Sequence, residues 1–457
     1  MLNESASVAN QTADEREMRR QQLRAALRPE ADALLERVVE ELVDLPDAQA
    51  FGAIEYTLRD CSHAFAAHAH QAGLQAGKKK GYQGSSTVCP HCQADARFVA
   101  YRFKTWLTVT GEVTLARAYY HCSACGQGHF PFDASNQLQG DHLSGGLRPL
   151  VCLAGTLVSF RDSSDDLLRR FCGLRLSASV VRLATEAAGQ QLLTLQQQGC
   201  IVHPVTAKPW NFSIEGQQQT AAYIGLDAFS VPIQRSGGKK ADKRRMLYTA
   251  TLYTPDKSRT HYLVDFDLDG IAAQLREASK TFGLGAADHL IALSDAGNGL
   301  EEAIHRHFWD DLLCILDWYH ASQHLHDYAK VLHAGDLQAQ TVWAKQAKDV
   351  LYEQGGTSLL VYLRAQPAPA GAAAAEELRK LLGYFTSNEH RTDYPRYRRH
   401  GWDIGSGPTE AGCKVVGARL KGSGMRWLEE GAAQVAPLRA LYQSGPEAWD
   451  AFWALAA

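Results

Sequence analysis

YIGLDAFSV at residues 223–231 begins the series of elements that sets the fold of the larger half of the chain. A short apolar run of this kind is typical of a buried strand. Four more strands and an amphipathic helix are predicted after it, with a further helix between the last two strands. The later strands are expected at 246–254, 261–266, 289–299 and 312–320, and the first helix at 271–283. Strands that come to alternate with helices indicate an α/β sheet.

The order of these elements narrows the fold. Three strands in succession favour antiparallel pairing, whereas a strand, a helix and a strand favour parallel pairing through a crossover. Three strands, a helix, a strand, a helix and a strand is the order of an RNase H-like core. The sequence between residues 321 and 400 is mostly helical and is broken by the low-complexity AQPAPAGAAAA at 365–375. We therefore expect an RNase H-like core that carries a helical insertion.

Three acidic residues lie where this core would use carboxylates. Asp227 is within the first strand, where a charge is costly unless it is paired or bound to a metal. Asp295 lies where the fourth strand gives way to a glycine-rich turn, and open α/β sheets bind ligands beyond the carboxyl ends of their strands. Glu410 lies in the first turn of a helix that begins near Pro408. Each residue alone could form a salt bridge or cap a helix, but together they suit hard divalent cations.

The composition is that of an ordinary globular protein. The 457 residues are 45% apolar and 21% charged, and the formal charge of −3 excludes a uniformly polybasic chain but not a local basic surface. The longest apolar run, at about 149–160, is shorter than the roughly 18 residues of a membrane span, and the polar N-terminus has no apolar signal segment. We expect a bacterial cytoplasmic protein without membrane contact, whose ten cysteines bind metal or are buried rather than paired.

Four of the cysteines form two CxxC pairs in a module at 88–135. Cys89 and Cys92 form the first pair, and Cys122 and Cys125 form the second. The residues between the pairs read as strands, so a β-hairpin would unite the pairs as the four-thiolate site of a zinc ribbon. Four thiolates leave no position open to water, which makes this one Zn²⁺ ion structural. The alternatives are redox pairs or unliganded thiols, and three histidines could substitute as ligands, namely His91, His121 and His129.

The N-terminal region is expected to be helical and to end in a linker. Residues 1–13 look disordered, and a helical pattern follows over 14–45, with a new helix opened by Pro29. A second helical pattern continues to about residue 70, and the Gly-, Lys- and Ser-rich stretch at 71–87 is typical of a linker. A helical bundle or dimerisation element is favoured over direct contact with DNA.

Residues 136–200 contain the pattern of a helix-turn-helix. An apolar helix over 144–160 precedes a short helix capped by Ser163 and its neighbours, a turn at Gly173, and a third helix capped by Ser177. An ordinary helical hairpin is the alternative, but the position behind a zinc ribbon favours DNA binding. The residues expected to face the major groove are Ser177, Ser179 and Arg182.

Basic residues concentrate in three stretches of the core. The loop at 235–245 carries six lysines or arginines against one aspartate. The stretch at 391–400 interleaves arginines with Tyr394 and Tyr397. The charged residues at 411–426 are all basic. Such charges bind phosphates without choosing a sequence, although each stretch could instead be a solvated face. The residues expected to contact DNA are Arg182, Arg235, Lys239, Lys240, Lys243, Arg244, Arg245, Arg396, Arg398, Arg399, Lys414, Arg419, Lys421 and Arg426. Buried packing is favoured over stacking on a base for two tryptophans, Trp402 and Trp427.

Residues from about 220 to 445 resemble the DDE transposases of bacterial insertion sequences, and in particular the ISKra family. The motifs that carry the resemblance are GLDAF around Asp227, LSDAGNG around Asp295, ILDWYHASQHL around Asp317 and His320, and GSGPTEAGCKVVGARLKGSGMRW around Glu410. The last motif is the most specific. The CxxC module also fits the family, whereas the first 80 residues are not covered by the resemblance.

The resemblance implies a DNA transposase that binds the terminal inverted repeats of its own element. Asp227, Asp295 and Glu410 would hold two Mg²⁺ ions, which Mn²⁺ could replace, for phosphodiester hydrolysis and strand transfer. Asp317 and His320 would place the DNA strand or assist proton transfer, although a structural hydrogen-bonded pair is slightly favoured. No nucleotide cofactor is expected, because the sequence has no GxxxxGK[ST] loop. The implied partners are double-stranded DNA and further copies of this chain, as a homodimer or higher oligomer on the nucleoid.

Two other functions fit the same residues. One is a DNA-binding regulator or domesticated protein with an inactive core, and the other is an RNase H-type nuclease without strand transfer. The expected fold is α/β, with an RNase H-like catalytic core and helical insertion preceded by a β-rich zinc ribbon and N-terminal helical and helix-turn-helix regions. The expected domains are the helical region and linker at 1–87, the zinc ribbon at 88–135, the helix-turn-helix-like region at 136–200, and the catalytic domain at 201–457 with its insertion at about 321–400.

Overall fold

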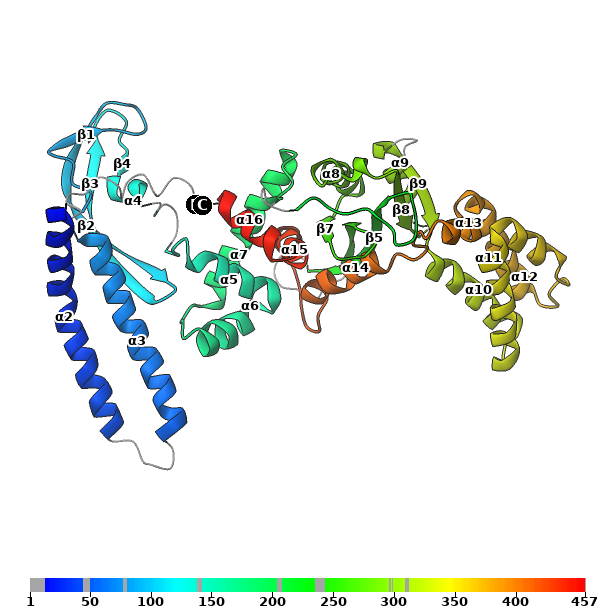
Figure 1. Ribbon diagram of the computed structural model, residues 1–457, viewed down its shortest axis with the longest axis horizontal. Helices are drawn as coiled ribbons and strands as arrows, with labels where there is room; N and C mark the ends of the chain where they lie inside the picture. Colours follow the sequence, from blue (N-terminus) through cyan, green and yellow to red (C-terminus); the bar gives the residue numbers. More distant parts are fainter. Residues whose placement is uncertain are drawn as a thin grey trace. The chain divides into compact units, whose positions relative to one another are not determined.

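A computed structural model of the chain shows a mixed α/β protein with two sheets (Figure 1). It describes residues 13–43, 50–76, 80–136, 138, 142–203, 208–234, 243–295, 297, 299–308 and 312–456. The chain divides into two compact units: unit 1 comprises residues 1–155 and 160–184, and unit 2 comprises 156–159 and 185–456. Residues 1–13 were expected to be disordered: residues 1–12 lie outside the described residues, whereas Ala13 already belongs to a helix. Within them, no helix combines the length and the apolar character that crossing a membrane requires.

Two long helices that pack side by side begin unit 1, α2 (Ala13–Val43) and α3 (Ala50–Gln75) (Figure 1). We expected Pro29 to open a new helix, but this prediction is wrong, because α2 continues through Pro29. Proline omits one backbone hydrogen bond, and no side chain of α2 is buried, so water can reach the carbonyl left without a partner. The linker expected at 71–87 is also too long, since α3 runs to Gln75 and the first strand begins at Ser86.

An antiparallel sheet of four strands forms the β-rich module that the cysteine pattern predicted. Its strands lie in the order β1 (Ser86–Val88), β2 (Asp95–Thr108), β3 (Gly111–Cys122) and β4 (Gly128–His129). Gly111, at a φ of 121°, closes the turn of the β2–β3 hairpin, a conformation that other residues rarely adopt. The hairpin packs Trp106 and Leu115 against Ala67 of α3.

Helices follow the module as predicted, with one difference. Their bounds are α5 (Leu147–Leu157), α6 (Phe160–Asp162), the π-helix η1 (Ser163–Phe171) and α7 (Ala178–Gln197). Gly173 makes the expected turn at a φ of 70°, and the Val180 N–H donates to Ser177 Oγ at 3.3 Å as the expected cap. The cap predicted at Ser163 is wrong, because α6 leads directly into η1. The buried Ser163 hydroxyl donates instead to the carbonyl of Ala154 at 2.8 Å.

A mixed five-stranded sheet forms the centre of unit 2 and contains all five predicted strands. They are β5 (Ala221–Ile233), β6 (Lys243–Tyr253), β7 (Thr260–Asp265), β8 (His289–Ser294) and β9 (Leu312–Leu316). The sheet order is β7-β6-β5-β8-β9. β5, β6 and β7 pair antiparallel, whereas β5 pairs with β8, and β8 with β9, in parallel. The parallel pairs follow the crossover helices α8 (Leu268–Thr281) and α9 (Leu300–Phe308).

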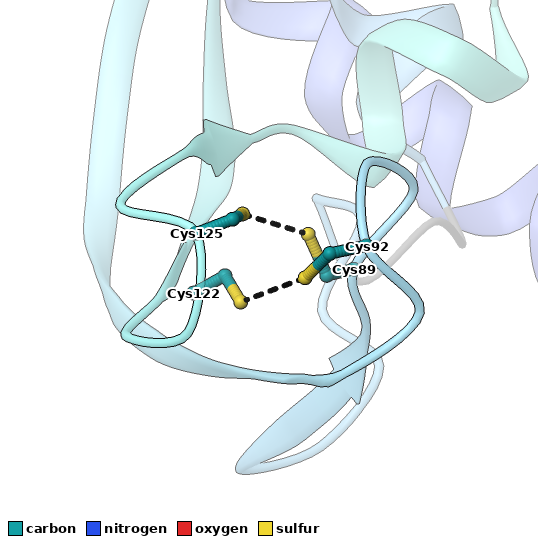
Figure 2. A group of neighbouring side chains, drawn as sticks. All are labelled: Cys89, Cys92, Cys122 and Cys125. Atoms are coloured by element: carbon teal, nitrogen blue, oxygen red, sulfur yellow. Dashed lines mark hydrogen bonds between the residues drawn. The ribbon is translucent and has the colours of Figure 1, made fainter.

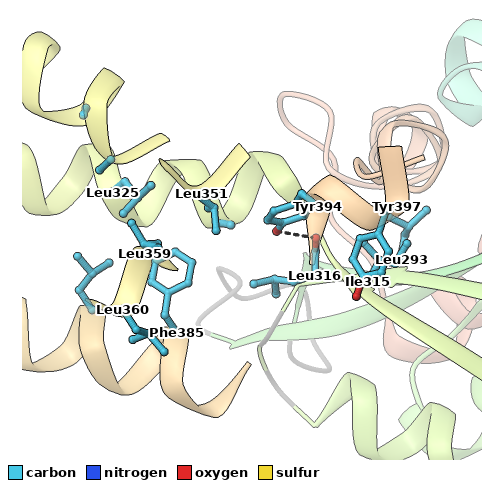
Figure 3. Close-up of a cluster of buried hydrophobic side chains, with 14 of the residues drawn as sticks. Leu293, Ile315, Leu316, Leu325, Leu351, Leu359, Leu360, Phe385, Tyr394 and Tyr397 are labelled. Carbon is cyan, nitrogen blue, oxygen red and sulfur yellow. Dashed lines mark hydrogen bonds between the residues drawn. The ribbon is translucent and has the colours of Figure 1, made fainter. Parts of the chain in front are cut away.

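Apolar side chains cover both faces of this sheet. One face packs against α8 and α9 in a cluster that contains Ile224 and Leu252. The other face contributes Tyr223, Leu293 and Ile315 to a second cluster, which the helices after β9 complete (Figure 3). Because side chains alternate along a strand, residues 225 and 227 lie on the same face as Tyr223.

The insertion expected at 321–400 is helical and begins at Trp318, directly after β9. Its segments are α10 (Trp318–Leu332), α11 (Leu337–Ala365), α12 (Ala372–Ser387), the short 3₁₀ turn η4 (Glu389–Arg391) and α13 (Tyr394–Arg399). Gly355, at a φ of 82°, interrupts α11, and the next residue, Gly356, donates its N–H to the Thr392 carbonyl at 3.1 Å. The insertion also bonds to the sheet, because the Tyr394 hydroxyl donates to the Leu316 carbonyl at 3.0 Å (Figure 3).

Three helices end the chain: α14 (Gly407–Leu420), α15 (Glu429–Gln443) and α16 (Pro446–Ala456). α14 packs across β5 and β6, and α15 packs against α14 and β7. This arrangement brings the helix that carries Glu410 onto the strand that carries Asp227.

Candidate functional site

In unit 1, two matching turns present the four cysteines of the CxxC pairs to one point (Figure 2). In the first turn the Cys89 N–H donates to the Ala94 carbonyl at 2.8 Å, and in the second the Cys122 N–H donates to the Gln127 carbonyl at 2.9 Å. Each turn contains a residue with positive φ, Gln93 at 63° and Gly126 at 72°. The β2–β3 pairing then brings the two turns together.

The four sulfur atoms have the spacing of a metal site. All lie within 4.8 Å of one another, with Cys89 Sγ 3.7 Å from Cys125 Sγ and Cys92 Sγ 3.6 Å from Cys122 Sγ. A tetrahedral zinc site with Zn–S bonds of about 2.3 Å has sulfur atoms about 3.8 Å apart. The backbone N–H of Cys125 lowers the pKa of Cys122 to about 7, so one thiolate is available at neutral pH. The predicted four-cysteine cluster, able to hold a metal such as zinc, is confirmed, and none of the described residues His91, His121 and His129 belongs to it.

The strand register of unit 2 aligns two of the predicted carboxylates. Gly225 of β5 pairs with Leu293 of β8 in parallel. Asp227 and Asp295 each lie two residues beyond that pair, so they lie at the same level, Asp227 within β5 and Asp295 just after the end of β8. The Asp227 charge acts on Asp295, and burial raises the pKa of Asp295.

A close helix-to-strand contact brings Glu410 toward these residues. Gly225 has no side chain, and the space where a Cβ would stand is occupied by the hydroxyl of Thr409, the residue before Glu410. Glu410 is exposed, and its pKa is raised by partial burial and by the charges of Asp317 and Asp227. The tight approach of α14 to β5 thus places a third carboxylate in the electrostatic field of the first.

Asp317 is the most constrained carboxylate of this region. It is fully buried, and one oxygen accepts hydrogen bonds from the His320 N–H at 2.7 Å and from His320 Nδ1 at 3.1 Å. The other oxygen accepts from the Ser406 N–H at 2.6 Å, one residue before α14. Next to it, the Trp318 N–H donates to the Ile404 carbonyl at 2.9 Å. Burial alone would raise the pKa of Asp317, but the bonds from His320 and Ser406 hold it below its usual value.

His320 is a cation at neutral pH. Its hydrogen bond to Asp317 raises the pKa of the imidazole to about 9, against an opposing effect of burial, and the charges of Asp295 and Asp227 contribute. The positive charge of His320 acts on four carboxylates, those of Asp227, Asp295, Asp317 and Glu410.

The tightest grouping differs from the predicted one. Asp317, His320 and Glu410 offer ligand atoms within 4.8 Å of one another, whereas Asp227 and Asp295 belong to no such group of three among the described residues. Asp317 uses both oxygens in hydrogen bonds, which suits a positioning role. Asp295 has the opposite character, because its Oδ1 is buried without a hydrogen-bond partner among the residues that the structure describes. That orphaned oxygen is a ligand atom available to a cation.

Arg391 supports the site and was misjudged from the sequence, which placed it in a basic surface stretch. It is fully buried, and its Nη2 donates to both the carbonyl and the Oγ of Ser294 at 2.9 Å. Its Nη1 donates to Glu301 Oε2 at 2.8 Å. Arg391 therefore fixes the residue that precedes Asp295. Its shorter hydrogen bonds are to Ser294 and Glu301, which are distant in sequence, so local composition gives no signal for its burial.

The other predicted DNA contacts divide into four sets. Arg235, Lys239 and Lys240 lie outside the described residues. Lys243 is described as part of β6, but its side chain is not. The predicted DNA contact of Arg419 is wrong, because the residue is 2% exposed and packs over the Trp427 ring. Arg245 is half-buried and pairs with Glu429. The exposed members of the set are Arg182 in unit 1 and Arg244, Arg396, Arg398, Arg399, Lys414, Lys421 and Arg426 in unit 2.

The aromatic residues of these stretches are core residues. We expected Tyr394 and Tyr397 to interleave with arginines on a surface. This prediction is wrong, because both tyrosines are buried. Trp402 and Trp427 are each 6% exposed, which confirms the packing favoured from the sequence. In α13 the aromatic side chains face the core while the arginines face solvent, as the helical period of 3.6 residues requires.

Comparison with known proteins adds no family. No protein-family model matches the chain, and no curated protein matches it. Assignment of a function therefore depends on the residues and their geometry.

We expect Gly225→Ala to weaken the contact that positions Glu410. A Cβ at residue 225 would meet the Thr409 side chain, so α14 must shift, at a cost of about 1–3 kcal/mol in the free energy of unfolding. Gly383→Ala in α12 is the control, because its Cβ enters open space and alanine favours a helix by up to about 1 kcal/mol. Urea unfolding of both variants measures the difference. Equal stability of Gly225→Ala and the parent would contradict the close contact.

We expect Cys92→Ser to lose the metal of unit 1 and to loosen its sheet. Removing one of four ligands lowers zinc affinity, and the structure around such sites depends on the metal. Hydrogen exchange should rise across β2, β3 and β4, while Cys172→Ser, whose thiol lies outside the cluster, should behave like the parent. Unchanged zinc content in Cys92→Ser would count against the four-cysteine site.

We expect His320 to titrate at a pKa of about 9 in protein kept free of divalent cations. Because this folded-state pKa lies above the ordinary value of 6.5, the stabilisation is complete below about pH 6.5 and is lost as the pH rises through 9. NMR titration of the His320 ring reports the value, and urea unfolding between pH 6.5 and 9.5 reports the stability. Asp317→Asn should lower the pKa; an unchanged value would mean that Asp317 is not its cause.

Proposed function

We propose that the chain is a DNA transposase whose unit 2 is an RNase H-like catalytic core. The single observation that carries the proposal is the register of β5 and β8, which aligns Asp227 and Asp295 beneath a helix that carries Glu410. Three antiparallel strands followed by two parallel ones, with helices between them, agree with that core. The sequence motifs around the same three residues resemble insertion-sequence transposases.

Asp227, Asp295 and Glu410 are the residues that would hold divalent cations, Mg²⁺ or Mn²⁺. Carboxylate oxygens are the ligands that hard cations prefer, and the unpartnered Oδ1 of Asp295 fits that use. Two cations in such a site activate water and stabilise the leaving oxygen of a phosphodiester. The mutual charge repulsion of Asp295, Asp227 and Glu410 supports the assignment, because a cation would relieve it.

Asp317 and His320 act as positioning residues in this proposal. Asp317 accepts hydrogen bonds from the N-terminus of α10 and from the residue before α14. It therefore fixes the position at which α14, the helix that carries Glu410, begins. His320 keeps a proton on Nδ1 toward Asp317 and brings a positive charge to a site that must accept a phosphate. Its cationic form offsets carboxylate repulsion before cations and DNA are bound.

Exposed basic side chains support DNA as the substrate. Arg396, Arg398 and Arg399 lie on α13, Lys414 lies on α14, the helix of Glu410, and Lys421 follows the end of that helix. Phosphate contacts of this kind give affinity that falls with salt and does not depend on sequence. Recognition of the inverted repeats is assigned to unit 1, through the four-cysteine module and Ser177, Ser179 and Arg182 at the start of α7.

Cleavage of DNA that contains the element end, in Mg²⁺, tests the proposal. Asp227→Asn and Asp295→Asn should each lower the nicking rate by at least about 10³-fold, because each removes a charged metal ligand. Binding to the same DNA should remain within a few-fold of the parent. Asp288→Asn is the matched control, because Asp288 lies at the opposite end of β8 and bonds to Thr220.

Each outcome of that experiment has a distinct meaning. Nicking followed by joining of the freed 3′ end to a target supports a transposase. Nicking without joining would indicate a nuclease instead of a transposase. If the parent binds the DNA without nicking it, the function indicated is that of a DNA-binding regulator. Parent-like cutting by Asp227→Asn would refute the assignment of the carboxylates.

A further inference from the structure

A second group of metal-ligating side chains lies in unit 2, apart from the carboxylate site. Glu301 and His305 stand one turn apart on α9, Cys314 lies on β9, and the three offer ligand atoms within 4.8 Å of one another. His390 of η4 approaches the same group from the insertion. A thiol, one or two imidazoles and a carboxylate form a donor set typical of zinc rather than magnesium.

The two distances from His305 agree with the edges of a tetrahedron, whereas the distance from His390 to Glu301 is shorter. His305 Nε2 lies 3.5 Å from Cys314 Sγ and 3.5 Å from Glu301 Oε1, and His390 Nε2 lies 3.0 Å from the same oxygen. Zinc bonds of about 2.0–2.1 Å to nitrogen or oxygen and about 2.3 Å to sulfur give edges of about 3.3–3.6 Å. The side chains of Glu301, His305 and Cys314 therefore stand close to the positions that they would occupy around one ion, whereas His390 lies outside this group of three and would have to turn toward it.

We propose that Glu301, His305 and Cys314 form a second zinc-binding site, with His390 as the fourth ligand. The site is open on one side, because the side chains of His305 and His390 are 44% and 62% exposed, while Cys314 is 8% exposed. Zinc can thus enter from solvent and meet a buried sulfur. Closure by His390 leaves no position for water, which makes the site structural.

Arg391 gives the site its supporting contact. Its Nη1 donates to Glu301 Oε2 at 2.8 Å, which leaves Oε1 directed to the two histidines. Carboxylate ligands of metals are commonly oriented by such hydrogen bonds. The positive charge of Arg391 opposes a cation, but the carboxylate of Glu301 and the thiolate of Cys314 supply two negative charges beside it.

The chain without metal has a different bonding pattern at this place. Burial raises the pKa of the Cys314 thiol to about 11, so the neutral thiol can donate a hydrogen bond to His305 Nε2. Zinc binding would release that proton, because the thiolate is the ligand. The hydrogen-bonded pair without metal is the alternative that an experiment must exclude.

A zinc ion here would join three parts of unit 2. α9 and β9 belong to the core, whereas η4 lies at the end of the insertion, between α12 and α13. The ion would add a direct bond from the insertion to the sheet, next to the Arg391 contact with Ser294. This inference does not depend on the proposed DNA chemistry.

Zinc content of the purified full chain, after dialysis against zinc-free buffer, tests the inference. We expect two zinc ions per chain in the parent and one in Cys314→Ser, His305→Ala and Cys92→Ser. His390→Ala should weaken zinc binding at the second site by at least about tenfold, as expected for loss of one ligand. His307→Ala is the control, because His307 lies on α9 but pairs with Asp269, and it should keep two ions.

The substitutions at His305 and His390 alter exposed side chains, so they test the site even if Cys314→Ser fails to fold. In a Cys89→Ser/Cys92→Ser background, added Co²⁺ should give the charge-transfer absorption of a thiolate ligand, and Cys314→Ser should abolish it. One zinc ion in the parent that Cys92→Ser removes and His305→Ala does not would overturn the proposal. Because the readout is metal content, this failure is separate from failure of DNA cleavage.

Discussion

The buried carboxylate of Asp317 is the constraint on which the arrangement of unit 2 depends. Removing an ionised carboxylate from water costs several kcal/mol unless hydrogen bonds replace the lost hydration. Here the replacements come from two places, the start of α10 and the residue before α14, so both must lie against the end of β9 for the charge to be tolerated. The position of Glu410 follows from this requirement and from the missing side chain at Gly225.

The two candidate sites use different physical means to bring distant residues together. In unit 1, turns of the same shape present pairs of thiols, and a long hairpin unites the turns, so the β-sheet and the metal site support each other. In unit 2, parallel register aligns Asp227 with Asp295, and the covering helix supplies the rest. The first arrangement suits a metal that maintains a fold. The second, with its mutually repelling charges, suits metals that take part in chemistry.

The sequence predicted those features that arise locally. Strands such as β5 and β8 follow from apolar runs, and the four-cysteine cluster follows from the spacing of its pairs. Features that depend on distant partners were missed: Arg391 and Arg419 read as surface charges, yet they are buried by contacts with Ser294 and Trp427. Because α2 is exposed, it also continues through Pro29, although proline usually marks the start of a helix. Which carboxylates approach closest depends on side-chain conformation, so the sequence could nominate Asp227, Asp295 and Glu410 but not their spacing.

The hydrogen bond between Trp318 and Ile404 has an evolutionary consequence. The two residues mark the departure and the return of the helical insertion, and they are immediate neighbours in space. A segment whose ends meet can grow, shrink or be exchanged while its host keeps its shape, because the gap that it must bridge is constant. Related chains could therefore differ widely in the length of this segment and still carry the acidic residues on either side of it at the same separation.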